Sequence, residues 1–123
     1  MGLDMWMRTT RIVPDAEVDF DLPRGSTQEL HYWRKHPNLH GWMERLYRAK
    51  GGKADDFNSV YLRLTGRDLD ELEKAVEGDA LPETAGFFFG ESDGTEAAGD
   101  LACIGKAREA IADGLTVLYT SWW

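Results

Sequence analysis

The sequence predicts a small α+β domain, in which a mixed sheet of about four to five strands packs against three helices. A length of 123 residues suits a single domain that spans 1–123. Alternating and helical apolar patterns follow one another along the chain, with glycine or proline between them. No apolar run approaches the ~18 residues of a membrane span. The single cysteine, Cys103, excludes an internal disulfide and is expected to be a buried, inert thiol in a reducing cytoplasm.

The first half of the chain is expected to hold two strands, a loop and a helix. Residues 3–13 alternate apolar and polar side chains as a strand does. Residues 14–29 are acidic, contain two prolines and a Gly-Ser pair, and are typical of a surface loop. Residues 30–35 follow as a short strand. A helix then begins at Pro37, whose fixed φ suits the first helical position, and ends at Gly51-Gly52.

The second half is expected to alternate strands with helices. Residues 57–64 alternate as a strand, and a helix runs from Thr65 or Gly66 to Gly78. The GFFFG segment is either a strand buried on both faces or a tight loop. A third helix, with Thr95 as its N-cap, ends at Gly114. Residues 115–123 form the last strand, which completes the α+β pattern.

The stretch from His31 to Lys53 differs in charge from the rest of the chain. It holds six cations against one acid, a formal charge of +5, whereas the other 100 residues carry −13 and the whole chain −8. All three histidines and four aromatic residues also lie in it. Cations interleaved with aromatic rings can neutralise phosphate and stack on a base. The acidic remainder disfavours nucleic-acid polymers, so the expected partner is a small phosphorylated nucleotide ligand.

The candidate ligand-binding residues stand where the second strand ends and the first helix begins. They are Trp33, Arg34, Lys35, His36, His40 and Arg48. Backbone N–H groups at a helix start lack intrahelical partners and attract anions. In this interpretation Trp33 or Trp42 stacks on the base, and the cations neutralise phosphates. Alternatively, Arg34 and Lys35 pair with the acidic loop and the aromatic rings are core.

His36 and His40 allow two further kinds of chemistry. Histidines four residues apart can hold a metal on one helix face, but His36 is expected at the N-cap, so we expect no metal site and no cofactor. No catalytic residue is assigned, although His36 or His40 could act as acid or base in a phosphodiesterase. We expect no activated serine, and Gly51-Gly52-Lys53 lacks the spacing of a nucleotide-cradling loop.

Several segments resemble a family of small phage and prophage proteins. They are MGLDMW, YWRKHPNLHGWM, RDLDELEKA, LPETAGFFFG, DLACIGKAREAI and YTSWW, which together span nearly the whole chain. Such proteins sometimes carry the label phosphoglycerate kinase, a two-domain enzyme for which 123 residues are too few. The resemblance implies a phage accessory protein expressed in the host bacterial cytoplasm.

Small phage proteins often disarm host immunity, some of them by sequestering nucleotide signals. We therefore expect a homo-oligomeric anti-defence protein that binds and sequesters a nucleotide-derived immune signal, such as an ADP-ribose derivative or a cyclic dinucleotide. One alternative is a phosphodiesterase that cleaves such a signal. Another is an acidic protein–protein inhibitor of a host factor. The GFFFG and SWW segments suit core, pocket or interface alike.

Overall fold

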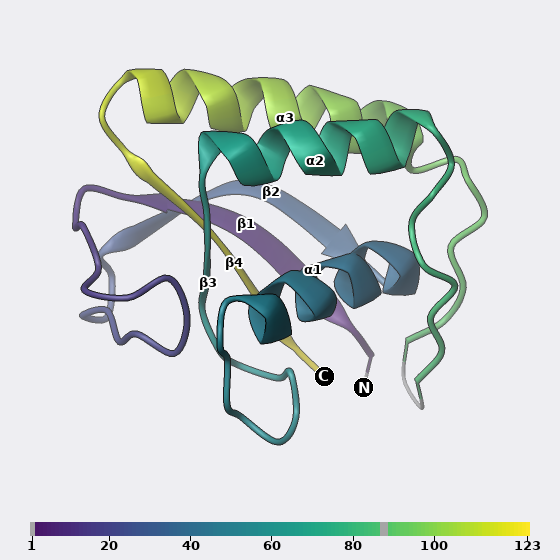
Figure 1. Ribbon diagram of the computed structural model, residues 1–123, viewed down its shortest axis with the longest axis horizontal. Helices are drawn as coiled ribbons and strands as arrows, with labels where there is room; N and C mark the ends of the chain where they lie inside the picture. Colours follow the sequence, from purple (N-terminus) through teal and green to yellow (C-terminus); the bar gives the residue numbers. More distant parts are fainter. Residues whose placement is uncertain (1, 87–88) are drawn as a thin grey trace.

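The structure, a computed structural model, describes residues 2–86 and 89–123 (Figure 1). The elements in chain order are β1 (Asp4–Thr10), β2 (Thr27–Arg34), α1 (Pro37–Ala49), β3 (Leu62–Leu64), α2 (Gly66–Glu77), α3 (Ala97–Ala112) and β4 (Thr116–Trp122). The predicted α+β class and its three helices are confirmed. In the described part of the chain the sheet has four strands, in the order β2-β1-β4-β3. All its pairings are antiparallel, where a mixed sheet was predicted.

The three described helices lie on one face of the sheet. Along β1, the fully buried Met5 and Met7 alternate with the half-buried Trp6 and Arg8. All three helices contribute to the core that contains Met5 and Met7, through Leu39, Met43, Leu69, Leu72, Cys103, Ile104 and Ala107. In Figure 1, α2 and α3 run side by side at the top of the view, and α1 lies lower in the picture on the same face of the sheet. The side chains of Trp6 and Arg8 therefore point away from the helices.

We call this second surface of the sheet the open face. Its residues follow from the cross-strand register and from the alternation of side chains along each strand. They include Asp4, Trp6, Arg8, Tyr32, Arg34, Thr120 and Trp122, and also Leu118, which is fully buried. Two of the aromatic side chains are exposed, Tyr32 by 41% and Trp122 by 64%.

Local signals set the helix boundaries much as the sequence predicts. Pro37 occupies the first turn of α1, and Thr65 caps α2 in a reciprocal capping box with Asp68. The Asp68 backbone N–H donates to the Thr65 hydroxyl at 3.3 Å, and the Thr65 N–H donates to the Asp68 carboxylate at 2.8 Å. Gly78 follows as the C-cap. These caps satisfy backbone groups that the helix itself leaves unpaired.

Replacing Thr65 by alanine is expected to lower the free energy of unfolding by about 1 kcal/mol, because the first turn of α2 loses its hydroxyl acceptor. Urea unfolding followed by circular dichroism measures the change. Thr95→Ala is the matched control, since the exposed Thr95 hydroxyl donates to Asp93 and caps no helix in the described structure. A loss no larger than that of the control would contradict the capping role.

Two strand boundaries differ from those predicted. The second strand begins at Thr27, inside the segment 14–29 predicted as a surface loop. The third covers only Leu62–Leu64, because Ser59 adopts a left-handed φ of 59° that interrupts the extended backbone of the predicted strand 57–64. In the 14–29 segment Phe20 is buried and stacks on Tyr61, with ring centroids 5.5 Å apart. The loop thus packs against the sheet.

The start of α3 also differs from the prediction. Its N-cap is Glu96 in place of Thr95, and no side chain bonds to the first turn.

Cys103 is buried as expected, and burial raises the pKa of its thiol to about 12. Phe87 and Phe88 of the GFFFG segment lie outside the described residues, whereas Phe89 is buried. Among the described helices, none is long and apolar enough to cross a membrane.

Candidate functional site

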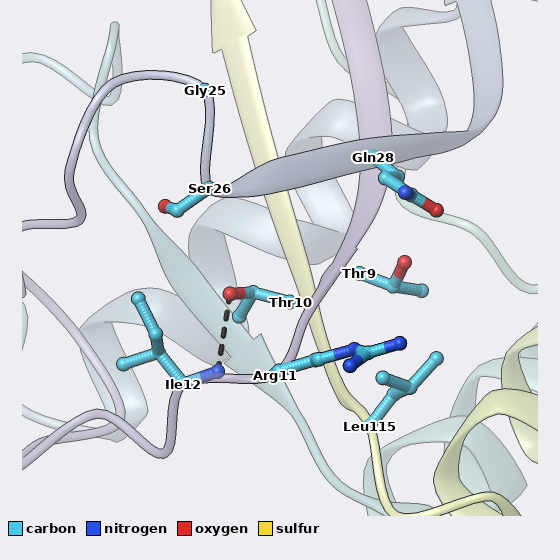
Figure 2. A pocket seen from close by; sticks show the side chains of 8 residues that line it. All are labelled: Thr9, Thr10, Arg11, Ile12, Gly25, Ser26, Gln28 and Leu115. Atoms are coloured by element: carbon cyan, nitrogen blue, oxygen red, sulfur yellow. Dashed lines mark hydrogen bonds between the residues drawn. The ribbon is translucent and has the colours of Figure 1, made fainter.

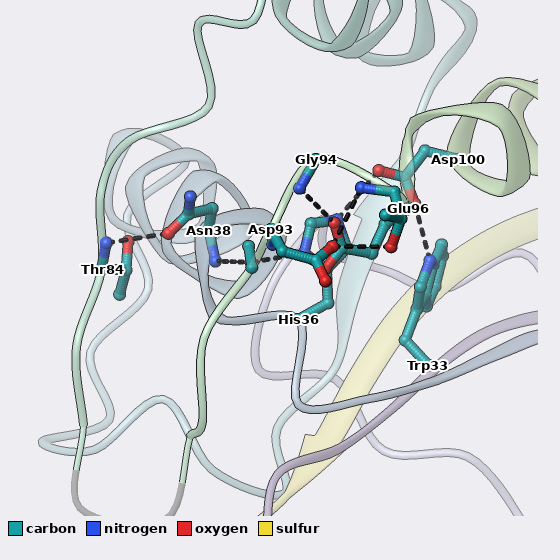
Figure 3. Close-up of polar contacts among 10 residues, drawn as sticks. Trp33, His36, Asn38, Thr84, Asp93, Gly94, Glu96 and Asp100 are labelled. Atoms are coloured by element: carbon teal, nitrogen blue, oxygen red, sulfur yellow. Dashed lines mark hydrogen bonds and ion pairs between the residues drawn. The ribbon is translucent and has the colours of Figure 1, made fainter.

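Trp33 lies in the core. It is 7% exposed and faces the helices from β2, opposite Met5. Its indole Nε1–H donates to Asp100 Oδ1 at 2.8 Å (Figure 3). The ring therefore offers a ligand base no free face. Trp42, the other ring considered for stacking, is half-buried and packs against the same core.

His36 connects the start of α1 to α3 and to the loop that precedes it. Its ring is buried, with Nδ1 2.7 Å from Ser92 Oγ and Nε2 2.9 Å from Asp100 Oδ2 (Figure 3). The Glu96 carboxylate lies 3.8 Å from Nδ1. Both ring nitrogens thus have partners within the protein.

Sequence reasoning missed two members of this cluster, Asp100 and Ser92. Asp100 is 2% exposed. Its position in the sequence could have indicated its burial, because Asp100 stands four residues before Ile104 and so lies on the apolar face of α3. Ser92 is half-buried, and it is the central residue of the sequence Gly90-Glu91-Ser92-Asp93-Gly94. This is a Gly-x-Ser-x-Gly pattern, which sequence reasoning overlooked.

His40 lies in an aromatic part of the core and is 1% exposed. Its Nδ1 is 2.7 Å from the hydroxyl of Tyr119, and its ring packs between Phe57 and Phe89 at centroid distances of 4.9 and 5.1 Å. Nε2 has no hydrogen-bond partner within the described residues. Burial lowers the pKa of His40 to about 4, an effect that the nearby Phe57 backbone opposes only in part. His40 is therefore a neutral core residue at physiological pH.

Two of the three predicted cations, Arg34 and Lys35, extend towards Gly2, whereas Arg48 lies on the 52–55 turn. The Arg34 guanidinium is on the open face, 3.5 Å from the Asp4 carboxylate. Lys35 is exposed with a left-handed φ of 56°. Arg48 lies over the Tyr47 ring at 5.1 Å, and its guanidinium donates to backbone carbonyls of the 52–55 turn. Arg48 thereby holds the chain segment that follows α1, which leaves Arg34 and Lys35 as the exposed candidates.

The open face brings together aromatic rings and cations from distant parts of the chain. Trp6 and Tyr32 contact each other across β1 and β2, with ring centroids 5.6 Å apart. The Arg8 guanidinium lies 5.5 Å from the Trp6 centroid, within the range of a cation–π contact. The hydrogen bond from Tyr32 to Asp4 raises the pKa of the Tyr32 hydroxyl and fixes its ring. The open face thus combines cations with aromatic rings, as the sequence predicts for residues 31–53, but Trp6 and Arg8 come from β1, outside that stretch.

Two hollows flank Trp122 on this side of the molecule. The larger, of about 630 Å³, lies between β1, β4 and the 21–27 segment. Its lining includes Trp6, Arg8, Arg24 and Trp122, together with the acid Asp21. The smaller, of about 150 Å³, is lined by Gly2, Asp4, Trp122 and Trp123. Trp122 therefore presents its exposed indole to both.

Another hollow, of about 330 Å³, lies at the far end of β1 (Figure 2). Its lining residues are Thr9, Thr10, Arg11, Ile12, Gly25, Ser26, Gln28 and Leu115. It has the Arg11 cation, but its described lining contains no aromatic ring. It therefore offers an anion one charge and a base no stacking surface.

In residues 2–86 and 89–123, no three side chains that could ligate a metal come together. The open face, with the hollows beside Trp122, is thus the surface of this chain best suited to a ligand.

Comparison of the chain with protein-family models, with curated proteins and with solved structures found no match.

Proposed function

We propose that the open face binds a small nucleotide-derived ligand and that the protein acts by sequestering it. The observation that carries this proposal is Trp122, 64% exposed between two hollows and close to the Trp6–Arg8 pair. Exposing an indole to water has a free-energy cost that a bound ring removes. A base stacked on an aromatic side chain contributes about 1–3 kcal/mol.

The charges beside the larger hollow suit the phosphates of such a ligand. Arg8 and Arg24 line it, and neither forms a salt bridge within the described residues. An arginine fork can donate two hydrogen bonds to one phosphate. Asp21 lines the same hollow and limits the positive charge available there. The arrangement suits one or two phosphates better than a longer anion.

The size of the hollow and the charge of the chain both favour a small ligand. A volume of about 630 Å³ lies within the range of small-molecule sites. The net charge of −8 repels long polyanions, which require an extended basic surface. The resemblance to phage proteins supplies the setting. In this proposal the ligand is an immune signal in the host bacterial cytoplasm, and an ADP-ribose derivative or a cyclic dinucleotide has the required base and phosphates.

Titration calorimetry at low salt with ADP-ribose and with a cyclic dinucleotide tests the proposal. We expect one of them to bind, and Trp122→Ala and Arg8→Ala each to weaken binding by about tenfold or more. Lys106→Ala is the matched control, because this exposed cation lies on α3, across the sheet from the open face. No heat from either ligand, or equal binding by the Trp122→Ala variant, would contradict the proposal.

The fate of the ligand separates sequestration from cleavage. A sequestering protein releases intact ligand on denaturation, whereas a phosphodiesterase releases fragments. The burial of His36 and His40 favours sequestration, since neither imidazole reaches the open face. The homo-oligomer expected from the aromatic C-terminal residues stays a prediction.

A further inference from the structure

We propose that Ser92, His36 and Asp100 form a second, separate site that hydrolyses small acyl esters. The Ser92 hydroxyl is 2.7 Å from His36 Nδ1, and His36 Nε2 is 2.9 Å from Asp100 Oδ2. A nucleophile bonded to a base, which a third group orients, is the arrangement that activates serine in unrelated folds. This cluster lies on the helix side of the sheet, away from the open face.

The hydrogen bonds assign the proton on the histidine ring. Asp100 is 2% exposed, and its Oδ1 accepts from the Trp33 indole at 2.8 Å. Its Oδ2 is then the acceptor for His36 Nε2–H. With that proton on Nε2, the neutral ring directs the lone pair of Nδ1 at the Ser92 hydroxyl. Asp100 is the positioning residue, because it fixes the tautomer and stabilises the imidazolium that forms when His36 takes a proton.

The backbone around Ser92 holds its hydroxyl in place. Its Oγ accepts a hydrogen bond from the Asn38 N–H at 3.1 Å, in the first turn of α1. This N–H has no intrahelical partner, so the bond satisfies it and fixes Oγ beside His36 Nδ1. The flanking Gly90 and Gly94 of the Gly-x-Ser-x-Gly pattern both have left-handed φ values, 71° and 89°, which glycine adopts without strain.

A cleft beside Ser92 limits the substrate. Its volume is about 70 Å³, room for an acyl group of two or three heavy atoms. Val76, Leu81 and Ala97 supply apolar lining. The carboxyl side chains of Asp79 and Glu96 also line it and repel anions. The substrate class is therefore a neutral or cationic ester of a short acyl group such as acetyl, and not a phosphate ester.

The reaction balances with water as the only co-reactant. Ser92 Oγ attacks the acyl carbon while its proton moves to His36 Nδ1. The bond to the alcohol breaks, and the alcohol leaves with that proton, which gives an acyl ester on Ser92. Water then attacks the same carbon and gives its proton to Nδ1. The carboxylic acid leaves, and Ser92 Oγ regains the proton.

Hydrolysis of p-nitrophenyl acetate by the full chain tests this site. We expect release of p-nitrophenolate above the buffer rate, and a loss of at least about 100-fold in Ser92→Ala. Ser26→Ala is the matched control, because the Ser26 hydroxyl donates to a backbone carbonyl and faces no histidine. Circular dichroism establishes that Ser92→Ala is folded.

A covalent label makes the test independent of any variant. Methanesulfonyl fluoride, whose small sulfonyl group suits the 70 Å³ cleft, should add one sulfonyl group to the unaltered chain, and peptide mass spectrometry should place it on Ser92. No turnover above that of Ser92→Ala, or a label on another residue, would overturn the proposal. In that case Ser92 serves only as a hydrogen-bond acceptor for the first turn of α1.

Discussion

Replacing Asp100 by alanine is expected to lower the free energy of unfolding by about 3–4 kcal/mol, the largest loss we expect from a single substitution. The carboxylate is buried between the Trp33 indole and the His36 ring, which both lie within hydrogen-bond distance of it. Without it, the indole N–H and the imidazole N–H are left in the core with no acceptor. Removing one partner of a buried polar group costs far more than the hydrogen bond itself contributes.

Urea unfolding of the variant and of the unaltered chain measures this loss. Asp113→Ala is the matched control, since Asp113 is an exposed acid at the C-cap of the same helix and its removal should change stability by less than about 0.5 kcal/mol. Asp100→Asn, which keeps one carbonyl acceptor, should fall between the two. A loss below about 1 kcal/mol in Asp100→Ala would mean that the network is not formed in solution.

Acidification is expected to destabilise the fold through His40. Burial lowers its folded-state pKa from 6.5 to about 4, so between these values the unfolded chain binds one more proton than the folded chain. The stabilisation is complete above pH 6.5 and is lost as the pH falls towards 4. The slope is about 1.4 kcal/mol per pH unit, and the total loss is about 3 kcal/mol.

Free energies of unfolding measured from pH 7 to pH 5 test this slope before most carboxylates titrate. His40→Gln should remove most of it, because glutamine does not titrate. His31→Gln should retain most of it, because His31 is only half-buried and remains partly hydrated in the fold. Equal slopes in the unaltered chain and in His40→Gln would show that the His40 ring is hydrated or protonated in the folded state.

The sequence predicted the elements whose limits depend on local chemistry. Pro37 and Thr65 mark the starts of α1 and α2, because a fixed φ and a capping hydroxyl act within one turn of the helix that follows. The second strand was less predictable. Its first residues follow a Gly-Ser pair that is typical of a loop, and they are held in the sheet by pairing with β1, a partner distant in sequence.

The candidate site depended still more on distant contacts. Alternation along β2 places Trp33 and Tyr32 on opposite faces, but only the docking of the helices decides which ring is buried. The Trp6–Trp122 neighbourhood exists because β1 pairs with β4, which no local pattern reveals. The sequence therefore predicted cations and aromatic rings together within residues 31–53, whereas on the open face such side chains also come from β1 and β4.

The pairing of β1 with β4 has a consequence for how the protein is made. These are the two middle strands of the sheet, and Asp4 pairs with Trp122, so β1 completes its pairing only after β4 has been made. Until then β1 can pair with β2 alone, and a contact of such long sequence separation forms slowly. The nascent chain should therefore keep one edge of β1 open to chaperones until β4 emerges.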